Sequence, residues 1–205
     1  MVQYATLPAA SADTLRVIIR SMLTGRDDYA DDFKGTIKTR LGALFNEVLK
    51  SGDNKSTFKT AAIIWVDKPI ERAEPKDIVI YLVKNLASGV IKRVDPATYH
   101  KLARESQDER TGATIGGTGP SLSEVYSEAA YNDQPELVAN TMFNESLHNK
   151  LNEGDEMHGE AKFVGGGGGF LQADLPRRKD LELQKEDKQL LGLALSKDRP
   201  QRVGL

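Results

Sequence analysis

The 205-residue sequence contains no cysteine. The chain therefore cannot form disulfides, thiolate zinc sites or iron–sulfur clusters, and it has no cysteine nucleophile. Histidine is also scarce, with three residues in all. A metal site in this protein would have to use histidine, aspartate, glutamate or asparagine side chains, so the position of each histidine is informative.

Long apolar runs are absent as well. No stretch approaches the roughly 18 consecutive apolar residues of a membrane span, and the first residues lack a basic segment followed by an apolar one. We therefore expect no membrane interaction. The predicted location is the cytoplasm, or the exterior by a route that uses no cleavable signal peptide.

The balance of charge argues against nucleic acid as a partner. The net charge is −2, with 28% charged and 39% hydrophobic residues, which is typical of a globular protein. Residues 124–160 hold nine acidic side chains against one lysine, Lys150, a local balance of −8. Such a segment repels phosphate backbones and attracts cations.

The hydrophobic pattern predicts one α+β domain over residues 1–205. Apolar residues at helical spacing indicate two N-terminal amphipathic helices, over 11–24 and 31–50. Short apolar runs rich in β-branched residues at 61–68 and 77–85 predict two buried strands. We divide the domain into N-terminal helices, a sheet with a central helix and a glycine-rich segment, and a C-terminal helix with its tail, at residues 1–50, 60–175 and 176–205.

The middle of the chain is less regular. Residues 95–108 carry a weak helical pattern, and 109–121 are predicted as a glycine-rich loop. Alternation over 122–128 predicts a half-buried or edge strand. The run Gly165–Gly169 lacks the Gly-Lys-Ser/Thr ending of a phosphate-binding loop, and we interpret it as a flap or a close backbone approach to a cleft. A charged helix is predicted over 179–196.

Residues 134–152 form the predicted helix that carries the candidate site. Pro135 suits its first turn, and Asn132 and Asp133 can cap it. One face is apolar, and the helix also carries a row of polar side chains four residues apart: Asn140, Asn144, His148 and Asn152. We expect a mostly buried helix whose polar row faces a cleft.

Within this helix stands the sequence Asn144-Glu145-Ser146-Leu147-His148. The four-residue spacing puts Asn144 and His148 on one helix face, and Glu145 borders the same site. The pattern resembles the His-Glu-x-x-His motif of zincin metallopeptidases, with asparagine in place of the first histidine. The resemblance covers roughly residues 61–170 and implies a zincin-like fold, with the strand at 122–128 as the edge strand beside a substrate cleft.

This resemblance implies zinc as cofactor and a role for each residue. Glu145 would be the general base that activates zinc-bound water, and a peptide or protein would lie against the edge strand. His148 and His158 would be zinc ligands, and Asn144 would take the place of the first ligand. Glu182 or Glu186 in the C-terminal helix are alternatives to His158 as the third ligand. His100 has no such context and is expected to be structural or exposed.

The sequence departs from the family in two respects. An amide oxygen is a poorer zinc ligand than imidazole, which predicts a weak site. The gap from His148 to His158 is longer than in metzincins, and no methionine follows Met157 to form their methionine turn. The predicted function is zinc-dependent peptide-bond hydrolysis or a degenerate remnant of it. The alternative is a catalytically inactive zincin scaffold that binds a protein partner.

Overall fold

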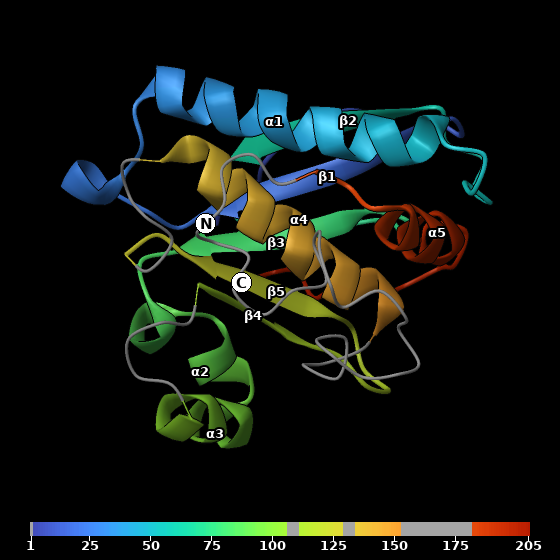
Figure 1. The fold of residues 1–205 in the computed structure, drawn as a ribbon. Coiled ribbons are helices and arrows are strands. Elements are labelled where there is room, and N and C mark those ends of the chain that lie inside the picture. The colour runs from blue at the N-terminus through green and yellow to red at the C-terminus, as the bar shows by residue number, and fades with distance from the viewer. Residues whose placement is uncertain (1, 106–110, 129–133, 153–181) are drawn as a thin grey trace.

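The computed structural model describes residues 2–105, 111–128, 134–152 and 182–205 (Figure 1). Over these ranges the chain is an α+β domain built on a five-stranded mixed sheet with strand order β2-β1-β3-β5-β4. Three of the four strand pairs are parallel, and only β4 runs antiparallel to its neighbour β5. The strands are β1 (Thr14–Ser21), β2 (Thr60–Val66), β3 (Ile78–Val83), β4 (Gly112–Ile115) and β5 (Leu122–Tyr126).

Helices cover both faces of this sheet. Three of them, α1 (Asp31–Lys50), α4 (Pro135–Leu151) and α5 (Lys185–Ala194), lie on one side, and α1 and α4 pack against each other (Figure 1). The short helices α2 (Ile91–Val94) and α3 (Pro96–Glu105) lie on the other side. Two 3₁₀ turns, Gly25–Asp27 and Leu86–Ser88, complete the elements. No described helix is long and apolar enough to cross a membrane.

The helix predicted over 11–24 is wrong, because this stretch contains the strand β1 and the N-terminal helical pair does not exist. β1 is buried from Leu15 to Ser21 and has strands on both sides. A central strand with both faces covered gives a nearly continuous apolar run, and such a run also matches helical spacing. The two arginines at positions 16 and 20 resemble the polar face of a helix, but in a strand they point to the same face of the sheet.

Other predictions are confirmed. The second N-terminal helix coincides with α1, the run 61–68 overlaps β2, the run 77–85 contains β3, and 95–108 contains α3. The C-terminal helix is confirmed as α5 but is shorter than predicted, since residues 182–184 are not helical and the helix ends at Ala194; residues 179–181 lie outside the described part. Every residue of β3 is buried, whereas β2 is half-buried because it is the last strand of the sheet on its side.

The assignment of the edge strand was wrong. Residues 122–126 form β5, which is buried at every position and lies between β3 and β4. The edge on this side is β4, within the stretch that was predicted as a glycine-rich loop. Its four residues include one glycine and carry no long apolar side chain except Ile115, so the sequence pattern of a strand is weak there.

The sheet separates two hydrophobic cores. The larger core lies between the sheet and helices α1, α4 and α5, where Phe45 and Phe143 meet edge to face with ring centroids 5.0 Å apart. The smaller core lies on the opposite face, beneath α2 and α3. Residues near both chain ends, Leu7, Val203 and Leu205, pack against this second core.

An acidic side chain lies at this second core. Glu124 on β5 is 0% exposed, and its Oε1 accepts the backbone N–H of Ile91 at the start of α2 over 2.7 Å. The Tyr126 hydroxyl donates to Oε2 at 3.2 Å. Burial raises the pKa of Glu124 to about 7, although these hydrogen bonds act in the opposite direction. The carboxyl group thus attaches α2 to the sheet, and it does so in an environment that favours its protonated form.

The free energy of unfolding is expected to fall as pH rises, because the buried carboxyl group of Glu124 ionises. Its folded pKa of about 7 exceeds the ordinary 4.5, so the folded state keeps a proton that the unfolded state releases. The contribution is present below about pH 4.5 and is lost as pH rises through 7, by roughly 3 kcal/mol. Glu124→Gln cannot ionise and should remove this slope in urea unfolding measured across the window. The exposed Glu128→Gln should retain it, and equal slopes in the two variants would contradict the assignment.

Candidate functional site

Helix α4 is buried at every position from Leu137 to Lys150. The apolar side chains Val138, Met142, Phe143 and Leu147 belong to the larger core. The remaining face is polar, yet it is also buried, which is unusual because a buried polar group without a partner costs about 1–3 kcal/mol. The hydrogen bonds of these polar side chains therefore show which of them are structural.

Two of the buried asparagines on α4 have clear structural partners. Asn140 accepts a hydrogen bond from Arg40 Nε of α1 at 3.0 Å. Asn149 and Gln201 of the C-terminal segment exchange two amide hydrogen bonds, at 3.0 and 3.1 Å. Gln201 also accepts the backbone N–H of Val79 on β3 at 3.1 Å. These contacts join α4 to α1, to the sheet and to the end of the chain.

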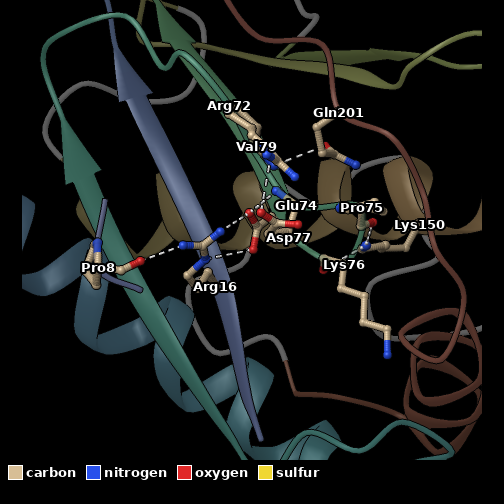
Figure 2. A network of polar contacts seen from close by, with 10 residues as sticks. All are labelled: Pro8, Arg16, Arg72, Glu74, Pro75, Lys76, Asp77, Val79, Lys150 and Gln201. Atoms are coloured by element: carbon tan, nitrogen blue, oxygen red, sulfur yellow. Dashed lines mark hydrogen bonds and ion pairs between the residues drawn. The ribbon is translucent and has the colours of Figure 1, made fainter. Parts of the chain in front are cut away.

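The end of α4 is fixed by a further polar network (Figure 2). Lys150 Nζ donates to the carbonyl of Lys76 at 3.0 Å, and burial lowers the pKa of Lys150 to about 8. The neighbouring Asp77 forms a two-pronged ion pair with Arg16 of β1, with N–O distances of 2.9 and 2.6 Å. The third guanidinium nitrogen, Nη1, donates to the carbonyl of Pro8. One network thus connects the N-terminal segment, β1, the β2–β3 connection and α4.

Glu145 is held against the edge strand β4. The Thr114 hydroxyl donates to its Oε2 at 2.6 Å and lies 2.9 Å from the Ser123 hydroxyl of β5. Gly112 approaches the same carboxylate so closely that a Cβ at this position would lie 2.6 Å from Oε1. The absence of a side chain at residue 112 therefore allows β4 and Glu145 to meet.

Thr114→Val should destabilise the protein by about 1–3 kcal/mol, because it removes a donor to a buried carboxylate without changing the side-chain shape much. Thr114→Ser keeps the hydroxyl and is the matched control, expected to lose much less. Both are compared by urea unfolding at neutral pH. Equal losses for valine and serine would indicate that the methyl group matters and the hydrogen bond does not.

Asn144 differs from the other asparagines of α4. It is 9% exposed, and its Oδ1 is buried without a hydrogen-bond partner among the residues that the structure describes. His148 follows one turn later, about 6 Å further along the helix axis, and is 5% exposed. One face of α4 thus carries two buried groups, the Asn144 carbonyl oxygen, which accepts no hydrogen bond from the described residues, and the His148 imidazole. Two such side chains can coordinate one cation.

The other predicted ligands are not brought to this place by the described residues. His158 and the run Gly165–Gly169 lie outside the described ranges, as does the side chain of Glu186. Glu182 is exposed, just before α5, and His100 is exposed on α3. Among the described residues no three His, Asp or Glu side chains are grouped as a metal site. Of the predicted zinc ligands, the described residues therefore place only Asn144 and His148 on one helix face, with Glu145 beside them.

Sequence reasoning missed Thr114 and Gly112. Both lie in the stretch predicted as a loop, where threonine and glycine are common turn residues and carry no distinctive signal. Their importance depends on β4 lying next to α4, which is a long-range contact. Comparisons with protein-family models, with curated proteins and with solved structures found no match for this chain.

Proposed function

We propose that this chain is a zincin-like domain whose helix α4 binds zinc weakly and acts on, or is descended from domains that act on, peptide bonds. The observation that carries the proposal is the buried, unpartnered Oδ1 of Asn144, one helical turn from the buried His148. A cation between these two side chains would satisfy the oxygen, for which the described ranges supply no donor. The adjacent Glu145 adds the carboxylate that hydrolytic zinc sites use.

The surroundings of α4 support the same function. An antiparallel strand, β4, lies against the helix and is the last strand of the sheet within the described ranges, so an extended peptide could pair along its edge beside Glu145. Zinc bound here would polarise a carbonyl group and lower the pKa of a bound water. Asn144 and His148 would hold the metal, and Glu145, oriented by Thr114, would accept the proton of the attacking water.

A second candidate is a scaffold that binds an extended partner along β4 without hydrolysing it. The contact that favours it is the Thr114–Glu145 hydrogen bond of 2.6 Å, because this bond already engages the carboxylate that would have to act as base. Both candidates place the ligand at the same strand edge. They differ in whether Glu145 exchanges protons with substrate.

Zinc is expected to bind to the wild-type protein near neutral pH and to raise its melting temperature, because a ligand that binds only the folded state stabilises it. His148→Ala should abolish this shift, whereas the exposed His100→Ala should not change it. Acidification should weaken binding, since a protonated imidazole has no lone pair for the metal. An equal zinc-induced rise in melting temperature for His148→Ala and wild type would exclude His148 as a ligand and contradict the proposed site.

A further inference from the structure

The strand β2 lies at the opposite end of the sheet from β4, and no described residue pairs with its outer edge as a strand. In the described ranges β2 has one neighbouring strand, β1. Its seven residues, TAAIIWV, include no charged residue and no proline. Sheet edges are normally protected by charges, prolines, bulges or a covering segment, because an unprotected edge pairs with other strands. This composition leaves the edge of β2 able to pair with a further strand.

The outward backbone groups of β2 follow from one hydrogen bond. The N–H of Ala61 donates to Asn46 Oδ1 of α1 at 2.9 Å and therefore does not point toward β1. Because backbone groups alternate along a strand, the N–H and C=O groups of Ile63 and Trp65 point the same way. Ala61, Ile63 and Trp65 thus direct their backbone N–H and C=O groups outward. Asn46 is hydrogen-bonded to the first of them, Ala61.

We propose that two copies of this chain associate through β2, antiparallel and two-fold symmetric about Ile63. In this register Ile63 faces its own copy, and the small Ala61 faces the large Trp65. Immediately outside the strand, Lys59 of each copy lies at the same end of the interface as Asp67 of the other; the N–H groups of Lys59 and Thr60 both donate to the Asp13 carbonyl, so the regular alternation begins at Thr60. Both charged side chains are exposed, and neither forms an ion pair within the described residues.

The charges select both the occupant and the register. A lysine and an aspartate placed symmetrically about one residue are complementary to a second copy of the same strand. A slip of two residues would place Lys59 opposite Trp65 or Pro69 and lose both charge pairs. Pairing joins the two sheets into one. The N–H of Ala61 would then donate to the partner's Trp65 carbonyl in place of Asn46 Oδ1. The β4 edge lies at the other end of the sheet and takes no part in this pairing, so the dimer does not depend on the proposed function.

Charge reversal tests the proposed pairing. Lys59→Asp places two aspartates opposite each other at both ends of the interface, and Asp67→Lys places two lysines there. Each variant alone should dimerise about tenfold more weakly than wild type, since like charges directly opposite are unfavourable. An equimolar mixture should dimerise about as well as wild type, because every contact becomes Asp with Lys. Sedimentation equilibrium, with folding checked by circular dichroism, measures all three.

Two outcomes would overturn the proposal. One is a wild-type protein that sediments as the 22.5 kDa monomer at a concentration of about 0.1 mM. The other is a mixture of the two variants that associates no better than either alone.

A single introduced cysteine tests the register independently, because the chain has no other thiol. Directly opposite residues of a hydrogen-bonded antiparallel pair have Cα atoms about 5.5 Å apart, which suits a disulfide. Ile63→Cys should therefore cross-link rapidly under mild oxidation. Ala62→Cys, whose thiols lie diagonally at a greater distance, should cross-link at least about tenfold more slowly. Equal rates for the two variants would exclude the proposed register.

Discussion

Asp77→Ala is expected to lower the free energy of unfolding by about 3–5 kcal/mol, the range for breaking one partner of a buried ion pair. The side chains of Arg16 and Asp77 are 8% and 5% exposed, and their closest N–O distance is 2.6 Å. Removal of the carboxylate leaves the guanidinium buried without its hydrogen-bonded counter-charge. It also removes the acceptor for the Glu74 backbone N–H and one of the two carboxylates, with Asp198, whose charge favours protonated Lys150.

A more exposed ion pair provides the matched control. Lys34 and Asp28 are 2.8 Å apart, but Asp28 keeps a third of its side chain exposed. Asp28→Ala should cost at most about 1 kcal/mol, as is usual for surface pairs. Chemical denaturation of the two variants at neutral pH compares them directly. A loss below 1 kcal/mol for Asp77→Ala would show that the network in Figure 2 contributes little to stability.

The second large effect concerns hydrolysis. Asn144→His completes the His-Glu-x-x-His pattern and should produce or increase zinc-dependent cleavage of a mixed peptide library. Adding Glu145→Gln to this variant should reduce cleavage by a factor of about 100 or more, because a glutamine cannot accept the proton of an attacking water. New peptide termini detected by mass spectrometry measure both effects.

The design separates catalysis from folding. Glutamine keeps an oxygen that can accept the Thr114 hydrogen bond, so the double variant should fold and bind zinc like Asn144→His. Cleavage that survives Glu145→Gln would come from another residue or from a contaminant. Absence of cleavage in every variant, with zinc bound and the fold intact, would favour the scaffold that binds a partner without hydrolysis.

The fold could be predicted where local patterns were strong. The amphipathic period of α1 and the β-branched runs of β2 and β3 specify their structures locally, and these elements were correctly predicted. β1 could not be distinguished from a helix, because its state depends on the two strands that flank it. β4 was missed because pairing with β5 and contact with α4 make it a strand, whereas its own residues are typical of a loop.

The candidate site was predictable only in part. Helical spacing alone places Asn144 and His148 on one face of α4, and the structure adds that both are buried. Spacing could not show that Asn140 and Asn149 have structural partners, because these partners come from α1 and from the C-terminal segment. Nor could it show that Asn144 Oδ1 has no partner within the described part of the chain. The fixation of Glu145 by β4 also required the three-dimensional structure.

Calorimetric titration of zinc into wild-type protein and into Asn144→His tests most directly whether residues 144 and 148 share one metal ion. An imidazole nitrogen is a better zinc ligand than an amide oxygen, so the substitution should tighten binding at least about tenfold, or about 1.4 kcal/mol, with one zinc per chain in both proteins. A change smaller than about twofold, or no zinc binding by either protein at neutral pH, would contradict a shared site.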